Sequence, residues 1–295
     1  MKLDLTRIAR PSGTLAMVAV DQREALRGMF APFQTSPVED FQLTRFKVDV
    51  ARELSPFASA LLVDQEFGLD AILEQGALAP HCGLIAATDL LLGPSGSAAN
   101  DTDIDRAIDP MRMVSIGAAG LKFLIFWRID ESVEKRAELV AKFNKLCKIS
   151  GLPSIIEIIV RQPNDSSISF DREEQLIQAA KEASSWKPDL YKAEVPFHGE
   201  GDAARITRNA ERISEAIGGP WVVLSNGVTA SNFASAVEAC ARGGASGFLA
   251  GRAVWADIVG ADNTSEALRQ VSIPRLKKLG EIVDQYAKPW SSWNH

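Results

Sequence analysis

The chain has few of the residues that hold transition metals or form disulfides. Its 295 residues include three histidines and three cysteines, and no two histidines have metal-ligand spacing. A catalytic zinc site usually takes two or three histidines, so a zinc mechanism is not expected. The cysteines are odd in number and widely spaced, which predicts buried, reduced thiols. They are Cys82, Cys147 and Cys240.

Long hydrophobic runs and a basic excess are missing as well. No apolar stretch approaches the roughly 20 residues of a membrane-spanning helix. Residues 1–10 lack the apolar region of a secretory signal. The formal net charge is −6, from 32 Lys and Arg against 38 Asp and Glu, which argues against a nucleic-acid surface. We therefore expect a cytoplasmic protein with small-molecule partners, and neither nucleic acid nor membrane.

Short apolar runs recur along the chain, each closed by a polar residue. They are Leu15–Val20, Ala58–Val63, Gly83–Ala87, Gly120–Phe126, Pro153–Ile159, Leu190–Val195, Trp221–Leu224 and Ala245–Ala250. Amphipathic helical spacing is clear between the later runs, at 132–150, 170–184, 201–217 and 231–242. Eight buried-type strands that alternate with helices predict a single (β/α)8 TIM barrel of the α/β class.

A doubly wound sheet is the competing fold, but it requires a glycine-rich turn after the first strand. This chain has Asp21-Gln22-Arg23 at that point. We expect one domain over 1–295 without linkers. The polar segment Gly93–Asp103 is predicted to be a solvated loop, with a lid as the alternative. The tail 286–295 contains two tryptophans and stays unassigned, because an interface and a disordered end are both open.

A TIM barrel has its active site at the C-terminal ends of its strands. Polar side chains inside or directly after the predicted strands should therefore converge on one mouth. They are Asp21, Arg23, Asp64, Gln65, Lys122, Arg128, Glu157, Arg161, Lys192, Glu194, Ser225 and Arg252. This convergence is the main functional signal in the sequence, because it does not depend on any single residue.

Lys192 lies inside a predicted strand, two residues before Glu194, so both side chains point to one face. If that face is the barrel interior, Lys192 and Lys122 are both partly desolvated and disfavour each other's charge. Lys192 would then be partly neutral and ready to form a Schiff base with a ketone. Glu157 is the candidate proton shuttle, and Lys122 would keep its proton and hold Glu157 or a substrate hydroxyl. Structural salt bridges or an exposed edge strand are the alternatives.

The last two predicted strands end in Ser225-Asn226-Gly227 and Gly251-Arg252. In this fold the corresponding loops frequently bind a phosphate through backbone N–H groups. Glycine lets the backbone approach the anion, and Arg252 adds charge and a two-pronged donor, unless it forms a structural salt bridge. On the opposite side of the mouth, Arg23 is a candidate for a second anion, unless it is a surface residue that starts the first helix.

Four segments carry a resemblance to a known family. They are Ala19-Val20-Asp21-Gln22-Arg23-Glu24-Ala25, the region 55–65 with Val63-Asp64-Gln65, Leu190-Tyr191-Lys192-Ala193-Glu194, and the block 244–255. From about Arg7 to about Gln285 the chain resembles the sulfofructosephosphate aldolases. These are class I aldolases of sulfoquinovose breakdown, or sulfoglycolysis, and are related to tagatose-bisphosphate aldolases.

The resemblance implies cleavage of 6-deoxy-6-sulfofructose 1-phosphate to dihydroxyacetone phosphate and 3-sulfolactaldehyde, without metal or cofactor, in a homo-oligomer (dimer or tetramer). It implies that Lys192 is the Schiff-base lysine, Glu157 the acid/base and Lys122 the neighbouring lysine. Asn226 stands where a second serine is expected. The expected substrate-binding residues are Asp21, Gln22, Arg23, Asp64, Gln65, Arg161, Ser225, Gly227, Gly251 and Arg252.

Two other functions remain open from the sequence. A tagatose- or fructose-1,6-bisphosphate aldolase would bind phosphate in place of sulfonate, and should have a denser basic cluster near Arg23 because phosphate carries more charge. A non-catalytic sugar-phosphate-binding barrel is the second. The presence of Lys122, Glu157 and Lys192 argues against it.

Overall fold

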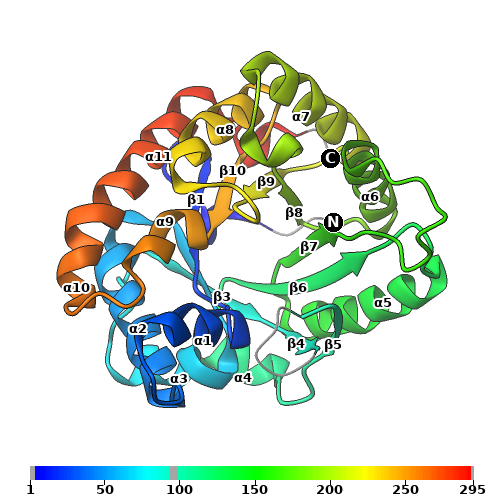
Figure 1. Ribbon diagram of the computed structural model, residues 1–295. Coiled ribbons are helices and arrows are strands. Elements are labelled where there is room, and N and C mark those ends of the chain that lie inside the picture. The colour runs from blue at the N-terminus through cyan, green and yellow to red at the C-terminus, as the bar shows by residue number, and fades with distance from the viewer. Residues whose placement is uncertain (1–3, 94–98, 294–295) are drawn as a thin grey trace.

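Eight parallel strands close into a barrel, which confirms the predicted (β/α)8 architecture. The computed structural model describes residues 4–93 and 99–293. Around the barrel the strands follow the order β1, β10, β9, β8, β7, β6, β3, β2 (Figure 1). Their bounds are Leu15–Ala19 (β1), Ala60–Val63 (β2), Gly83–Ala87 (β3), Gly120–Trp127 (β6), Ser154–Val160 (β7), Leu190–Glu194 (β8), Trp221–Leu224 (β9) and Gly247–Ala250 (β10).

Helices surround this barrel, and the amphipathic segments predicted from the sequence are helices of that layer. The α-helices are Glu24–Phe30 (α1), Asp40–Leu54 (α2), Asp70–Glu74 (α3), Pro110–Ser115 (α4), Val133–Ser150 (α5), Arg172–Trp186 (α6), Ala203–Ile217 (α7), Ala230–Arg242 (α8), Arg252–Trp255 (α9), Thr264–Ala267 (α10) and Ile273–Tyr286 (α11). Side-chain caps begin several of them: Ser132 accepts from the Lys135 N–H, and Asp202 from the Ala204 N–H.

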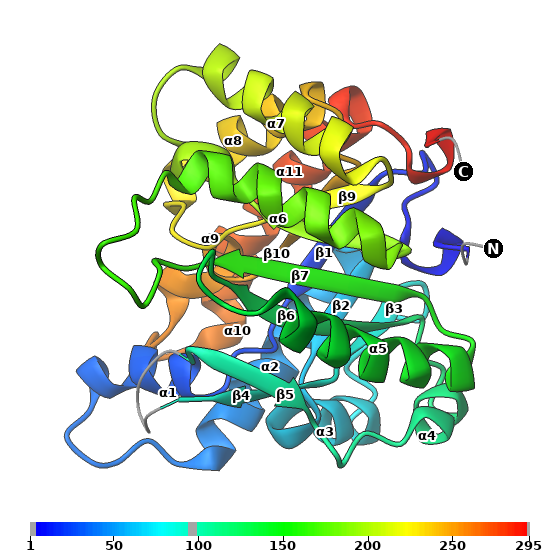
Figure 2. The same ribbon diagram turned by 90° about the vertical axis from the view of Figure 1, so that its right-hand side faces the viewer.

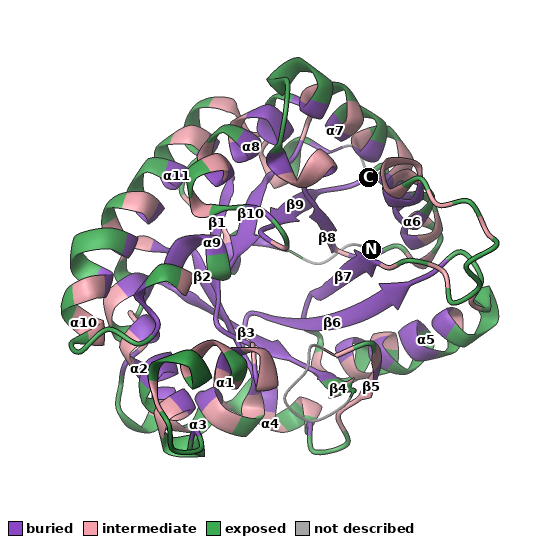
Figure 3. Ribbon diagram, in the orientation of Figure 1, coloured by how far each residue is buried: buried purple, intermediate pink, exposed green. Residues whose placement is uncertain are grey.

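The strand pleat separates two apolar layers, as the sequence pattern predicts. Leu190 belongs to the cluster inside the barrel, with Leu15, Met17, Leu62, Ile85, Ile155, Val222 and Leu249. Tyr191 packs in the larger cluster between barrel and helices. The strands are buried along their length (Figure 3). Lys192 and Glu194 therefore share the inner face with Leu190, above the apolar plug that fills the lower barrel.

An antiparallel hairpin lies at the mouth, where the sequence predicted a solvated loop over Gly93–Asp103. Strand β5 (Asp101–Ile104) pairs with β4 (Asp89–Leu92), so that prediction is wrong for Asp101–Asp103, while residues 94–98 lie outside the described residues. The hairpin is tied to the barrel: Arg128 Nη2 donates to the Asn100 carbonyl at 3.1 Å, and Lys135 Nζ lies 3.0 Å from Asp101 Oδ2. Figure 2 shows it beside the C-terminal ends of the strands.

The C-terminal tail packs on the opposite end of the barrel. The Trp290 N–H donates to the Gly13 carbonyl at 3.0 Å. The Trp293 indole is buried, and its Nε1 donates to Ser246 Oγ at 3.1 Å. Up to residue 293 the tail is therefore part of the packed structure, and both ends of the described chain lie away from the mouth (Figure 2).

The three cysteine thiols are buried and unpaired, as predicted. Burial raises the pKa of the Cys82 thiol to about 12, so this thiol is protonated and unreactive near neutral pH. Among the described helices, none is both long and apolar enough to cross a membrane.

Candidate active site

A cavity of about 390 Å³ opens at the C-terminal ends of the strands. Lys122, Glu157 and Lys192 line it, on the neighbouring strands β6, β7 and β8. Each side chain is inward because of the strand alternation, and the parallel register places Glu157 directly beside Lys192. The structure therefore brings together the three residues that the sequence singles out for catalysis.

The Glu157 carboxylate bridges the two lysines. Its Oε2 lies 2.9 Å from Lys192 Nζ and 2.8 Å from Lys122 Nζ. The three residues are at most 5% exposed. Burial alone would raise the pKa of the Glu157 carboxyl, but the ammonium groups of Lys122 and Lys192 outweigh it and hold that pKa below its usual value. Glu157 is therefore ionised at neutral pH and able to accept a proton.

Lys122 is surrounded by carboxylates. Besides Glu157, its Nζ lies 2.9 Å from Asp21 Oδ2 and 3.0 Å from Asp89 Oδ1. Burial disfavours the ammonium, but these carboxylates hold the pKa of Lys122 well above its usual value. In return Lys122 and Lys192 lower the pKa of the buried Asp21 carboxyl. Lys122 therefore keeps its proton at neutral pH, as the sequence analysis expects.

Asp89 is a site residue that the sequence analysis missed. It is 1% exposed, and its second carboxylate oxygen lies 3.7 Å from Arg23 Nη1. It stands two residues after strand β3 and begins the hairpin. The expectation that polar residues directly after a barrel strand lie at the mouth, which selected Asp21 and Asp64, would also have selected it. Its burial accompanies the pairing of β4 with β5, which the sequence analysis did not predict.

Arg23 lines the pocket, and its guanidinium already lies beside two carboxylates. Glu66 Oε2 lies 3.7 Å from its Nε, and Asp89 contacts its other side. Burial disfavours the guanidinium, yet the neighbouring carboxylates raise the pKa of Arg23 above its usual value. Gln22, beside it on the pocket wall, has a buried Oε1 with no hydrogen-bond partner among the described residues. This side of the mouth is therefore acidic around a single arginine.

Asp64 and Gln65 do not lie on the pocket wall, which corrects their predicted contact with substrate. Asp64 is fully buried, forms an ion pair with Lys47 of α2, and accepts from the Phe67 N–H at 2.7 Å. A buried lysine needs a counterion, and Asp64 supplies it behind the barrel. Gln65 Nε2 donates to the Ala107 carbonyl at 3.3 Å.

The basic side of the mouth is formed by the ends of β7, β9 and β10. Ser225, Asn226, Gly251, Arg252 and Arg161 line the pocket there. The Arg161 guanidinium stacks on Phe126, 4.9 Å from the ring centroid, and forms no hydrogen bond or ion pair among the described residues. Burial lowers the pKa of Arg161 and, with repulsion from Arg128 and Arg252, outweighs the opposing attraction of the Glu194 carboxylate. Neither the Arg161 nor the Arg252 guanidinium forms an ion pair among the described residues, so this side can accept an anion.

The two glycines predicted to bind an anion, Gly227 and Gly251, have different structural roles. A Cβ at Gly251 would lie 2.6 Å from the Ala19 carbonyl oxygen, so only glycine lets this strand end pass β1 at the pocket wall. Gly227 does not line the pocket. It has a φ of +75°, and a Cβ there would lie 2.5 Å from His198 Nδ1. Gly227 thus shapes the turn that presents Ser225 and Asn226.

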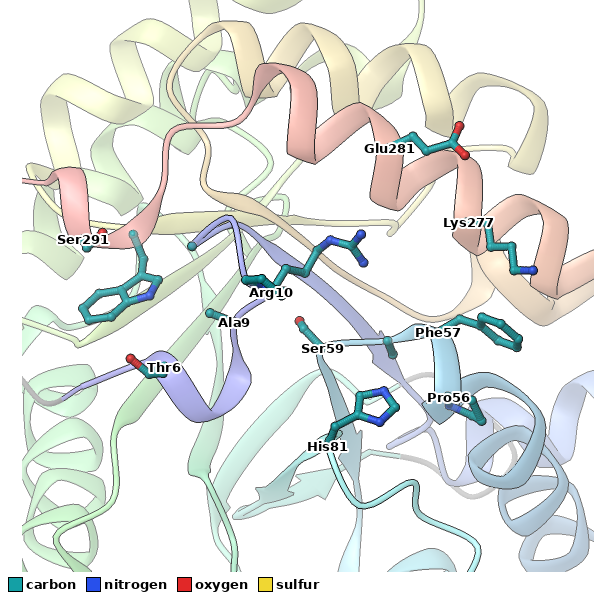
Figure 4. A pocket seen from close by; sticks show the side chains of 14 residues that line it. Thr6, Ala9, Arg10, Pro56, Phe57, Ser59, His81, Lys277, Glu281 and Ser291 are labelled. Atoms are coloured by element: carbon teal, nitrogen blue, oxygen red, sulfur yellow. The ribbon is translucent and has the colours of Figure 1, made fainter.

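A larger cavity of about 940 Å³ lies at the opposite end of the barrel (Figure 4). Its charged side chains are dispersed or already engaged. Arg10 Nη2 lies 2.6 Å from Asp284, and Lys277 Nζ lies 4.5 Å from the Phe57 ring centroid. Among the described residues that line it, no titratable cluster is comparable to Lys122, Glu157 and Lys192. No group of three or more His, Cys, Asp or Glu in the described chain has the geometry to hold a metal ion.

Comparison with known proteins relates the chain to a family of aldolases. A family model described as DeoC/LacD family aldolase matches residues 15–257. Tagatose 1,6-diphosphate aldolase 2 of Streptococcus mutans serotype c is 28% identical over 326 aligned residues, covering 97% of this chain and 95% of that protein. Tagatose 1,6-diphosphate aldolase of Lactococcus lactis subsp. lactis is 28% identical over 316 residues, covering 97% and 96%.

Two solved structures share the fold. One, described as a Schiff base forming fructose-1,6-bisphosphate aldolase, has a TM-score of 0.63 at 16% identity and covers 95% of this chain and all of its own. The fructose-bisphosphate aldolase from Slackia heliotrinireducens has a TM-score of 0.62 at 18% identity, covering 91% of this chain and 86% of its own. At these identities the likeness establishes the barrel.

Proposed function

Because the chain belongs to the DeoC/LacD family of aldolases, we propose that it is a class I aldolase whose Schiff-base nucleophile is Lys192. The observation that carries the proposal is the contact of Lys192 with Glu157, at 2.9 Å on the pocket wall, beside the protonated Lys122. A nucleophilic amine needs a neighbour that takes its proton, and Glu157 is ionised and within reach.

The proposed reaction begins with attack of neutral Lys192 on the C2 ketone of the substrate. Glu157 returns the proton it took from Lys192 to the hydroxyl of the carbinolamine, which leaves as water and gives a protonated imine. The imine accepts the electron pair of the C3–C4 bond as that bond breaks. Glu157 takes the proton of the C4 hydroxyl, and the aldehyde leaves. Glu157 delivers this proton to C3 of the resulting enamine, and hydrolysis of the imine releases the ketone product and regenerates Lys192.

Lys122 serves this cycle as a fixed positive charge. Its three carboxylate contacts hold the ammonium in place, and its ion pair with Glu157 holds that carboxylate next to Lys192. A fixed charge in a buried site needs no reorganisation during the reaction, so it stabilises the developing charge efficiently.

The proposed substrate is 6-deoxy-6-sulfofructose 1-phosphate, which yields dihydroxyacetone phosphate and 3-sulfolactaldehyde. We place the phosphate on the basic side of the mouth, with Ser225, Gly251, Arg161 and Arg252, and the far end near Arg23. Carboxylates surround Arg23, and Glu24 and Glu66 line the same wall. That setting tolerates a singly charged sulfonate better than a phosphate, which carries nearly two charges. Tagatose or fructose 1,6-bisphosphate is the alternative substrate, since the curated relatives are tagatose 1,6-diphosphate aldolases.

The substrate proposal is tested by comparing cleavage of the sulfonated ketose phosphate with that of tagatose and fructose 1,6-bisphosphates. We expect kcat/KM to favour the sulfonated substrate by at least about tenfold, the equivalent of one weakened charged contact. A preference for either bisphosphate would assign the enzyme to the alternative. Borohydride treatment with dihydroxyacetone phosphate should add mass at Lys192. Absence of cleavage and of trapping with every ketose would instead favour the non-catalytic barrel.

Replacing Glu157 with glutamine separates its role from that of Lys192. Glu157→Gln keeps the shape but cannot accept a proton, so we expect kcat for cleavage to fall by about 10²–10⁴-fold, the usual contribution of a positioned acid/base. Trapping of dihydroxyacetone phosphate on Lys192, followed by mass spectrometry over hours, should still occur. Glu174→Gln, which changes an exposed carboxylate on α6, is the matched control and should keep wild-type kcat. Unchanged kcat in Glu157→Gln would remove Glu157 from the mechanism.

A further inference from the structure

Glu194 is a buried carboxylate that the proposed mechanism does not use. It is 1% exposed and ends strand β8, two residues after Lys192. Its Oε2 accepts the Val160 N–H of β7 at 2.8 Å, and Arg172 Nη2 lies 3.3 Å from its Oε1. A carboxylate held from two sides in a buried position has a fixed orientation. The same Oε1 also accepts a third contact, from Asn226.

Asn226 connects this carboxylate to the basic side of the mouth. Its Nδ2 donates to Glu194 Oε1 at 2.9 Å, and its Oδ1 accepts from Arg252 Nη2 at 2.6 Å. A carboxylate only accepts and a guanidinium only donates, so this is the one orientation of the amide that satisfies both neighbours. The contacts link the C-terminal ends of four neighbouring strands, β7, β8, β9 and β10.

Arg252 gains a defined position from this chain of contacts. The side chain is exposed on the pocket wall, and Asn226 is its hydrogen-bond partner among the described residues. An exposed arginine otherwise samples many rotamers, and ordering it on binding would weaken affinity for an anion. Arg161, on the same wall, repels Arg252 and is attracted by Glu194, but its guanidinium forms no hydrogen bond among the described residues. Only one of these two guanidinium groups is therefore held in place by hydrogen bonds.

We propose that Glu194 and Asn226 are positioning residues that act through Arg252 to pre-organise the binding site for the phosphate of the ketose. Glu194 fixes the amide of Asn226, and the amide fixes Arg252 at the mouth. An asparagine contacts Glu194 and Arg252 at the same time. This explains why position 226 holds an asparagine where a serine was expected. The proposal rests on the proposed function for the identity of the anion.

The test measures binding of inorganic phosphate and of dihydroxyacetone phosphate by calorimetry, which does not require catalysis. Asn226→Ala should weaken both anions by about tenfold, since a hydrogen bond to a charged group is lost. Combining Asn226→Ala with Arg252→Ala should weaken phosphate no further than Arg252→Ala alone, because Asn226 acts through that side chain. In steady state, Asn226→Ala should raise KM for the phosphorylated ketose about tenfold and leave kcat within about twofold.

A pair of substitutions supplies the rescue. Asn226→Asp places two carboxylates face to face, so the bridge should fail and phosphate affinity should fall. Adding Glu194→Gln restores a donor opposite the carboxylate introduced at position 226, while its amide oxygen still accepts the Val160 N–H. Arg172 keeps Glu173, 2.8 Å away, as its partner. The double variant should therefore recover most of the lost phosphate affinity.

Two further measurements separate positioning from loss of structure. Unphosphorylated dihydroxyacetone should be trapped by borohydride equally in wild type and Asn226→Ala, because it lacks the group that Arg252 binds. Glu182→Gln removes a carboxylate of α6 that lies outside the pocket and forms an ion pair with Arg136 of α5 at 2.7 Å. It should lower the unfolding midpoint and leave phosphate affinity unchanged.

Three results would overturn the proposal. They are wild-type phosphate affinity in Asn226→Ala, additive losses in the double variant with Arg252→Ala, and equal loss of phosphorylated and unphosphorylated ligands. Failure of the proposed function has a different signature. Wild-type protein would then bind phosphate with the predicted dependence on Asn226, but no ketose would be trapped on Lys192.

Discussion

Lys192→Met is expected to abolish aldol cleavage, with kcat lowered on the order of 10⁴-fold or more, the scale seen when a covalent nucleophile is removed. Methionine has a similar length and keeps the pocket filled, but it cannot form an imine. Glu157 retains Lys122 as its counterion at 2.8 Å, so the carboxylate is not left unpaired and the barrel should still fold. Cleavage by a coupled assay and the circular dichroism spectrum measure the two effects separately.

The chemical signature of this substitution is as informative as the rate. Wild-type protein treated with dihydroxyacetone phosphate and borohydride should gain mass on the peptide that contains Lys192, and Lys192→Met should gain none. Lys181→Met, which alters an exposed lysine on α6, is the control and should label like wild type. Labelling of the Lys192→Met protein at Lys122 would reverse the roles assigned to the two lysines.

Lys122→Met is expected to have the largest effect on stability. It removes the ammonium that contacts Asp21, Asp89 and Glu157, and two of these carboxylates would lose their closest cation. Breaking a buried ion pair by removing one partner lowers the free energy of unfolding by about 3–5 kcal/mol. Urea denaturation at pH 7 should show the midpoint shift, and cleavage should fall because Glu157 loses its orientation.

A second substitution distinguishes this explanation from simple loss of packing. Adding Asp89→Asn to Lys122→Met removes one of the stranded charges, so part of the lost free energy of unfolding should return. Asp89→Asn by itself leaves Lys122 with Asp21 and Glu157 and should be milder. If Lys122→Met unfolds at the wild-type urea concentration, the carboxylates around Lys122 are not energetically coupled to it, and its assigned role as a fixed charge is wrong.

The pH dependence of stability follows from the same cluster with a defined sign. The pKa values of Asp21 and Glu157 are lowered in the folded state. Their contribution to the free energy of unfolding is therefore complete above the pKa values they have in the unfolded chain, and it is lost as the pH falls through their pKa values in the folded protein. Lys122 has a raised pKa, and its contribution is lost only at strongly alkaline pH. The ion pairs of the site are thus intact across the neutral range.

Two kinds of information about this protein are local in the chain, and the sequence by itself determined them. The number of barrel strands follows from apolar runs that recur between helical patterns, and the inward direction of Lys122, Glu157 and Lys192 follows from the alternation of side chains. Both depend on neighbours only a few residues away. The strand-end rule then places those side chains at one mouth, because parallel strands in a closed barrel end on the same side.

Only the tertiary structure decided which charges meet. Asp64 follows a strand just as Asp21 does, yet it forms an ion pair with Lys47 of α2 and not with a residue of the pocket. Asp89, at the start of a hairpin that was not predicted, forms an ion pair with Lys122. Glu194 shares a strand face with Lys192, but it accepts a hydrogen bond from Asn226, which in turn accepts one from Arg252. The physical reason is that a buried charge goes to whichever counterion or donor the neighbouring strands and helices bring within about 3 Å. That choice depends on residues far apart in the chain, which no local pattern encodes.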